Sequence, residues 1–304
     1  GASKLAIPAV GGTMNILTRG IESKEGLKFV QDLGGNGYLK TTLGYNSGKL
    51  KNGWGYSLAA SYKKSNGWVD ETWSKGTFYY IKVQKKIKNH QLSFTAFGAP
   101  QSHGQRSYKK AISLYDKNYA ADLGVDTTGV DGDYGLQYNE HWGELNRYTV
   151  NYDENDNPTD TVYATNERLN SKMNYYHKPQ LSLNHFWAAS NKLVVSNILY
   201  ASLGNGGGTS VTPSLTTANY NQNRQIDFQG IFDNNAGNTR HAFLGDPSID
   251  ANYSTTEHKS TQFIRSSINN HRWFGLLSSY NLEVNPELTL SGGLDLRHYT
   301  GQHY

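Results

Sequence analysis

Residues 54–62 read WGYSLAASY, and large and small side chains alternate along them one by one. The aromatic and aliphatic side chains occupy the even positions, apart from the small Ala60, and Gly, Ser and Ala fill the odd ones. A period of two residues is typical of a β-strand with two unlike faces. The same alternation returns in residues 38–45 (YLKTTLGY) and 288–298 (LTLSGGLDLRH). These stretches predict an all-β chain.

Working outward from this stretch, the alternation predicts eight strands of roughly ten residues each. They are expected near residues 36–46, 53–64, 75–87, 90–99, 175–187, 192–203, 268–283 and 287–299. Residues 25–33 (EGLKFVQDL) form a candidate ninth strand ahead of them. Residues 193–203 alternate less cleanly, so the sequence leaves the two faces of that strand open.

The connections between these strands are sorted by length. Turns of Asn, Gly, Ser or Pro composition are short, whereas residues of about 100–174 and 204–262 form long loops. The stretch 204–208 (GNGGG) has the composition of a flexible loop. Transmembrane β-barrels place short turns on the periplasmic side and long loops on the outside. We therefore predict a transmembrane antiparallel β-barrel.

A soluble alternative stays open, because a secreted β-domain that binds carbohydrate also alternates and also carries Tyr and Trp. The parity of the strands favours part of a larger barrel. If residues 25–33 form a strand, the first strand of the wall rises from the periplasmic side. The last strand then ends on the outside at Tyr304, where another outer loop would be expected. We therefore expect a piece of a larger wall.

Composition narrows the functional classes. Of 304 residues, 12% are aromatic, which excludes a disordered chain. The 29 basic and 25 acidic residues give a net charge of only +4, and they are scattered, so nucleic-acid binding gains little support. Cysteine is absent, which excludes disulfides and thiol chemistry. No apolar run approaches the roughly 20 residues of a transmembrane helix.

The first residues of the chain resemble a known motif. Residues 1–19 (GASKLAIPAVGGTMNILTR) are similar to the end of the plug domain of TonB-dependent outer-membrane receptors. The matching positions include Gly11, Gly12, Thr13 and Asn15. The pair of glycines also permits a sharp turn into a strand. A phosphate-binding loop is disfavoured, because it needs a helix after the glycines.

This resemblance implies a fold, a location and partners. Residues 1–22 would be the end of the plug, and residues 23–304 would be the first part of a large barrel in the cell outer membrane. Residues 97–108 and 293–304 are similar to the Bacteroides-type branch of the family. The resemblance implies import of a large scarce nutrient, with a ferric siderophore as the favoured ligand. It also implies a TonB complex that acts on a plug region absent from this chain.

Two alternatives remain within the membrane. One is a glycan-importing member of the same family, which would work with a surface lipoprotein. The other is a small structural or adhesive barrel.

Candidate ligand-binding residues lie in the first long loop. Gln101, His103, Gln105 and Arg106 form a polar group where that loop opens. If they face the lumen, Arg106 could bind an anion and His103 a metal-bearing ligand. The alternative is that Gln101, Gln105 and Arg106 bond to loop backbone and fix the fold.

The aromatic content of the same loop gives further candidates, namely Tyr134, His141 and Trp142. Aromatic side chains on outward loops can stack on sugars or on planar iron-binding groups. No pair of carboxylates, nucleophile elbow or histidine motif of a metal enzyme is present. We therefore expect no enzyme activity, no cofactor and no resident metal.

Overall fold

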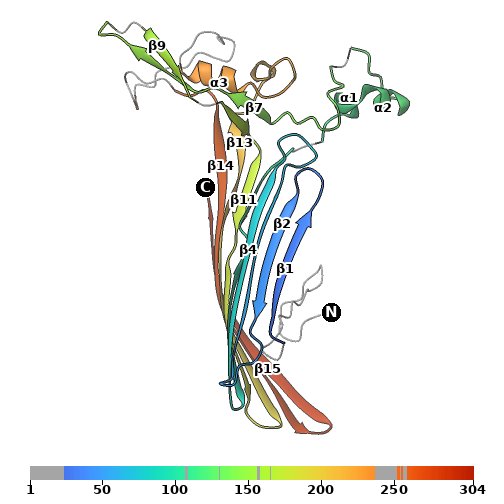
Figure 1. The fold of residues 1–304 in the computed structure, drawn as a ribbon, viewed down its shortest axis with the longest axis vertical. Coiled ribbons are helices and arrows are strands. Elements are labelled where there is room, and N and C mark those ends of the chain that lie inside the picture. Colours follow the sequence, from blue (N-terminus) through green and yellow to red (C-terminus); the bar gives the residue numbers. More distant parts are fainter. Residues whose placement is uncertain are drawn as a thin grey trace.

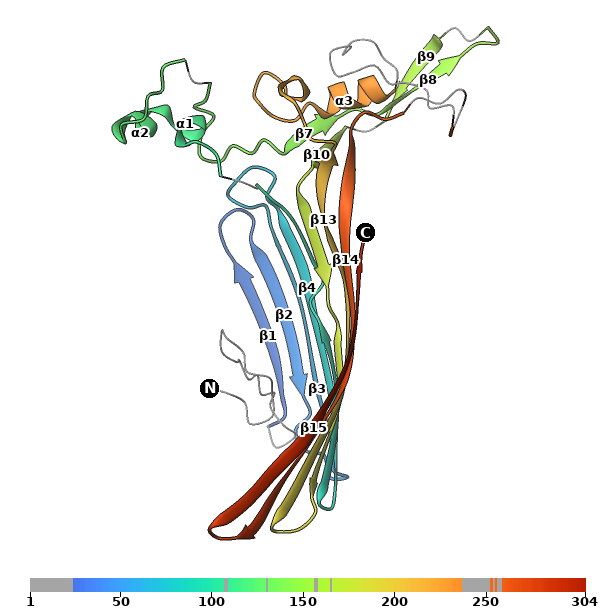
Figure 2. The same ribbon diagram turned by 180° about the vertical axis from the view of Figure 1, so that it is seen from behind.

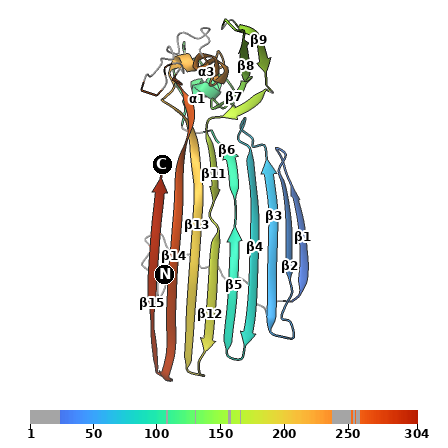
Figure 3. The ribbon, with the colours of Figure 1, turned by 90° about the vertical axis from the view of Figure 1, so that its left-hand side faces the viewer.

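The computed structural model describes residues 24–106, 109–129, 131–155, 158–164, 166–236, 252–253, 255 and 259–304. A single antiparallel sheet contains most of its strands, which stand side by side in Figure 3. These strands are β1 (Gly26–Leu33), β2 (Leu39–Asn46), β3 (Trp54–Ser65), β4 (Ser74–Ile87), β5 (His90–Gly98), β6 (Gln101–Gly104), β11 (Met173–His177), β12 (Gln180–Ala188), β13 (Leu193–Thr212), β14 (Phe263–Asn285) and β15 (Leu288–His303). The predicted all-β, antiparallel fold class is confirmed.

Residues 1–22, including Gly11, Gly12, Thr13 and Asn15, lie outside the described residues. None of the described helices has the length and apolar character of a helix that crosses a membrane.

The sheet keeps the chain order from β1 to β5 and then continues through β12, β13, β14 and β15. Two of its strands are interrupted at a proline. Pro100 separates β5 from β6, and Pro179 separates β11 from β12, because proline has no N–H to give to the ladder. Each proline carbonyl still accepts a bond, from the N–H of Thr77 at 2.9 Å and of Leu203 at 3.1 Å. The sheet therefore runs on across both interruptions.

The candidate strand at residues 25–33 is confirmed as β1, and the expected strand at 175–187 is divided between β11 and β12. The expected strand 192–203 is longer than predicted. β13 continues to Thr212, so the second loop begins at Pro213 and not at residue 204. The prediction of a flexible loop at 204–208 was wrong. Gly204, Gly207 and Gly208 pair with β14, and Gly206–Gly208 pair with β11.

The short turns and the long loops lie at opposite ends of the sheet (Figure 3). The sheet bends along its length (Figures 1 and 2). One connection departs from the predicted sorting by length. Residues 34–38 form a short turn that lies at the long-loop end, between β1 and β2.

The two faces of the sheet differ in composition. We call one the apolar face; a row of directly paired residues across it is Tyr56, Val83, Phe94, Leu183, Leu199, Leu276 and Leu296. The neighbouring row on the other side, the polar face, is Ser57, Lys82, Thr95, Ser182, Tyr200, Gly275 and Arg297. Leu183 is 48% exposed and Phe94 is 43% exposed, whereas Lys82 is 6% exposed and Thr95 is 7% exposed. Most apolar side chains of the first row are exposed, whereas the polar side chains of β4 and β5 in the second row are buried.

The long loops fold together at one end of the sheet into a unit that we call the cap, the described residues of 105–172 and 213–236 (Figures 1 and 2). Its elements are α1 (Ile112–Tyr115), α2 (Lys117–Asp122), β7 (Trp142–Leu145), β8 (Tyr148–Tyr152), β9 (Pro158–Tyr163), β10 (Glu167–Asn170), η1 (Thr217–Asn219) and α3 (Phe228–Asn235). β7 pairs with β10, and β8 pairs with β9. Asp227 caps the N-terminus of the helix α3, and its carboxylate accepts a bond from the Gly230 N–H.

The cap contains a buried apolar cluster of Leu145, Ile226, Phe228 and Ile231. Leu145 comes from the first loop and the other three come from the second. The packing therefore joins two segments that are distant in the sequence. This cluster is the hydrophobic core that the described residues form, and it lies in the loops and not on the sheet.

Candidate ligand-binding site

The contact between the two loops positions the candidate site. The N–H of Ile226 donates to the carbonyl of Glu140 at 3.0 Å. The Tyr138 hydroxyl donates to the carbonyl of Arg224 at 2.6 Å. The Tyr148 hydroxyl donates at 2.9 Å to Oδ1 of the buried Asp233 on α3. These bonds hold the edge of the first loop against the turn and helix of the second.

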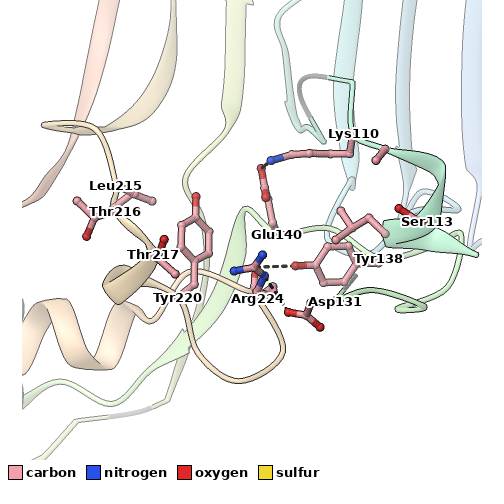
Figure 4. A pocket seen from close by; sticks show the side chains of 12 residues that line it. Lys110, Ser113, Asp131, Tyr138, Glu140, Leu215, Thr216, Thr217, Tyr220 and Arg224 are labelled. Carbon is pink, nitrogen blue, oxygen red and sulfur yellow. Dashed lines mark hydrogen bonds and ion pairs between the residues drawn. The ribbon is translucent and has the colours of Figure 1, made fainter. Parts of the chain in front are cut away.

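A cavity of about 390 Å³ opens between the two loops (Figure 4). The residues that line it are Lys110, Ala111, Ser113, Leu114, Asp131, Tyr138, Glu140, Leu215, Thr216, Thr217, Tyr220 and Arg224. The first seven come from one loop and the other five from the other. Its volume falls within the range that is usual for sites that bind small molecules.

All four charged residues of the lining are paired with each other. Lys110 Nζ lies 2.7 Å from Glu140 Oε1, and Arg224 Nε lies 3.1 Å from Asp131 Oδ2. The imidazole Nε2 of His141 lies 3.6 Å from the same Glu140 oxygen. The lining therefore offers polar contacts without an excess of charge of either sign.

Burial sets the chemistry of the tyrosines in this cavity. Burial, and then the negative charge of Glu140, raise the pKa of the Tyr138 hydroxyl. The same two causes raise the pKa of Tyr220. Both side chains therefore remain neutral hydrogen-bonding groups over the physiological range.

The turn that presents Arg224 is built by one asparagine. The Asn221 side-chain oxygen accepts bonds from the N–H groups of Asn223 at 2.9 Å and Gln225 at 3.1 Å. Arg224 itself has a positive φ of 59°, which is uncommon for a residue other than glycine. A backbone held in this way is characteristic of turns whose neighbours fix their shape.

The structure divides the predicted site residues into separate groups. Gln101 and His103 lie on β6, where the Gln105 side chain contacts His103 at 3.1 Å. Gln105 also donates its backbone N–H to the carbonyl of Lys172 at 2.7 Å. These three residues therefore lie where the first loop leaves the sheet, and none of them lines the cavity.

Arg106 bonds to the backbone of its own loop. Its Nη1 donates to the carbonyls of Leu136 at 2.8 Å and Tyr138 at 2.9 Å. Its guanidinium lies 4.8 Å from the centre of the Tyr115 ring. These contacts are the ones expected if Arg106 bonds to loop backbone and fixes the fold of the loop.

Tyr134, His141 and Trp142 do not line the cavity, and the first two of them contact residues that do. Tyr134 donates to Asp131 Oδ1 at 2.8 Å and stacks on Tyr138 with 4.8 Å between ring centres. The backbone N–H of His141, which is buried, is bonded to the side chain of Asn139. Trp142 is on β7, and its buried Nε1 has no hydrogen-bond partner within the part of the chain that the structure describes.

Sequence reasoning did not select the residues that line the cavity. The abundance of Tyr in the first loop was a signal for Tyr138. Tyr220 and Arg224 belong to the second loop, and nothing in their local sequence indicates that they face Glu140. Among the residues that the structure describes, no cluster of three or more potential ligands could hold a metal ion.

No protein-family model matches the chain, and no curated protein matches it. Among solved structures, the chain is similar to the crystal structure of the siderophore receptor PiuA from Acinetobacter baumannii, with 8% sequence identity and a TM-score of 0.40. The alignment covers 92% of this chain and 47% of the other. The chain thus spans about half the length of the receptor that it matches.

Proposed function

We propose that this chain is part of a TonB-dependent outer-membrane receptor that captures a large nutrient outside the cell and imports it. The observation that carries the proposal is the inverted sheet. Most side chains of its apolar face are exposed while polar side chains of β4 and β5 on the other face are buried, as for Leu183 at 48% and Lys82 at 6%.

This arrangement is unfavourable for a sheet surrounded by water. Apolar surface left in water costs about 25 cal/mol per Å² of free energy, and the apolar face extends across many strands of the sheet. A sheet in the wall of a barrel has the opposite requirement, because lipid covers its outside while polar groups line its lumen. The two faces fit a wall whose apolar face contacts lipid.

The cap supports the receptor part of the proposal. It joins the ends of the long loops, it has a hydrophobic core of its own, and it encloses a polar cavity. In a barrel of this kind the long loops lie outside the cell. The resemblance of residues 1–19 to the end of a plug domain, with Gly11, Gly12, Thr13 and Asn15, supports a receptor that is opened by a TonB complex.

For the ligand, we propose a ferric siderophore or a related iron complex. This choice rests on the resemblance of residues 97–108 and 293–304 to one branch of the family. A glycan, delivered with a surface lipoprotein, is the second candidate. It is favoured by one observation, namely that the cavity has paired charges and neutral tyrosines, which suit an uncharged ligand rich in hydroxyl groups.

The proposal is tested with single cysteines, since these 304 residues contain none. Leu183→Cys and Ser182→Cys are adjacent on β12 and lie on opposite faces. In isolated outer membranes, a fluorescent label on Leu183→Cys should be quenched by lipid-attached quenchers and protected from water-soluble ones. A label on Ser182→Cys should show the reverse, with Phe94→Cys and Thr95→Cys as a second pair on β5.

Equal quenching at the two positions of each pair, or recovery of the chain in the soluble fraction, would refute a lipid-facing wall. The ligand is decided separately. Cells that lack the protein should fail to grow on a ferric complex as the iron source if the first candidate is right. They should fail on an oligosaccharide as the carbon source if the second is right.

A further inference from the structure

A second cavity lies on the polar face of the sheet, apart from the cap. Its volume is about 370 Å³, and it is lined by Tyr176, Lys178, His271, Trp273 and Tyr299. These residues come from β11, from the break between β11 and β12, and from β14 and β15. The wall is therefore aromatic, with a single lysine and no acidic residue.

Two glycines of β13 lie beside the residues that line this cavity. A Cβ atom on Gly206 would lie 2.6 Å from the Tyr176 ring, which is closer than real Cβ contacts allow. A Cβ atom on Gly204 would lie 3.4 Å from His271 and 3.5 Å from Lys178. The contact at Gly204 is of ordinary length, whereas Gly206 has no room for a side chain while Tyr176 lies against the sheet.

Lys178 is a cation without a carboxylate partner. Its Nζ lies 5.8 Å from the centre of the Trp273 ring, and it makes no ion pair with any residue in the described part of the chain. The cap cavity differs in this respect, because there each charge has an opposite charge beside it. An ammonium group beside aromatic surface, with no carboxylate next to it, is available to form a charge-assisted bond with an anion.

One pair of directly opposite residues beside the cavity carries polar groups without hydrogen-bond partners among the described residues. Ser202 of β13 is directly opposite Trp273 of β14. The buried hydroxyl of Ser202 and the indole Nε1 of Trp273 both lack a hydrogen-bond partner among the described residues. Ser202 is only 7% exposed. Buried polar atoms are nearly always bonded, so this pair of residues beside the cavity departs from the usual pattern.

We propose that this cavity binds a planar aromatic group that carries a carboxylate or phenolate. The rings of Trp273 and Tyr299 supply stacking surfaces, and Lys178 supplies the charge. The ring of His271 is stacked beside Tyr299, with 5.8 Å between the ring centres. The proposal deepens the proposed function, since it gives the lumen wall a second binding position for part of an imported ligand.

The probe is 2-hydroxybenzoate, and binding to the detergent-solubilised protein is measured by calorimetry. Two comparison compounds separate the contributions: benzyl alcohol keeps the ring without the charge, and cyclohexanecarboxylate keeps the charge without the flat ring. We expect saturable binding of 2-hydroxybenzoate and much weaker binding of both others. Equal binding of benzyl alcohol would overturn the role of Lys178.

Lys178→Met should weaken binding of 2-hydroxybenzoate about tenfold or more, because it removes a charge-assisted contact. Lys178→Arg should retain most of the affinity. Lys75→Met is the matched control, since Lys75 lies 5.4 Å from the ring centre of Trp73 in a similar pair that does not line this cavity. An affinity that is unchanged in Lys178→Met, or lost equally in the control, would refute the site.

Absence of binding, with the cysteine pairs still reporting a lipid-facing wall, would refute this inference alone. Soluble behaviour in the cysteine experiment would refute the proposed function instead.

Discussion

Replacing Ile226 with alanine should loosen both long loops at once. Ile226 is 2% exposed and packs in the cluster with Leu145, Phe228 and Ile231. The change removes three carbon groups, worth about 0.8 kcal/mol each. A residual void of about 50 Å³ would add about 1.2 kcal/mol at roughly 24 cal/mol per Å³. The expected loss of cap stability is therefore about 3–4 kcal/mol.

Hydrogen exchange read by mass spectrometry measures this loss segment by segment. A loss of about 3 kcal/mol corresponds to exchange that is faster by about two orders of magnitude. Amides of residues 142–145 and 167–170 should accelerate together with those of 228–235, because the cluster joins both loops. Amides in the middle of β13 and β14 should be unaffected, since the sheet has its own hydrogen-bond ladder.

The matched control is Ile112→Ala in α1, where the side chain is 41% exposed and lies outside the cluster. It should change protection of the cap by about 0.5 kcal/mol or less, as surface substitutions usually do. Acceleration confined to residues 228–235 in Ile226→Ala would show that the two loops do not form one unit. An effect as small as that of the control would refute the buried core.

Two further predictions concern the cap. Arg106→Met should increase exchange at residues 136–138, because the guanidinium bonds to two carbonyls there and a bond to a charged group is worth about 1.5–3 kcal/mol; unchanged exchange, with ligand affinity lost, would favour direct ligand contact instead. Raised pH should destabilise the cap, because the pKa of Tyr138 in the folded protein lies above the unfolded value of about 10. The stability that Tyr138 contributes is fully present below the unfolded pKa and is lost as the pH rises through the folded pKa. Tyr138→Phe should flatten this decline in alkaline melting curves, and an identical decline in both proteins would contradict the assignment.

Much of the sheet could be predicted from the sequence, because strand alternation is a local property. The eight predicted strands and the candidate strand at residues 25–33 all correspond to strands of the sheet, and only the short β6 was not expected. Residues 204–208 were misread for the same reason. Glycines resemble a loop when only their neighbours in sequence are considered, yet Gly206 is held in a strand by β11 and by the Tyr176 ring that covers it.

The candidate site, unlike the sheet, could be predicted only in small part from the sequence. The sequence pointed to the first long loop and to its tyrosines, and it placed Arg106 where that loop opens. It gave no indication that Glu140 would meet Ile226 and that Tyr138 would meet Arg224, since these contacts join residues more than eighty positions apart.

The sequence by itself therefore determined the class of structure, the sorting of turns and loops, and the existence of two unlike faces. Only the tertiary structure decided which face is exposed, because that depends on register across the strands from β3 to β15. It also decided where the cavities lie. A cavity is formed by side chains from separate strands and loops, and its shape and charge arise only when long-range packing brings them together.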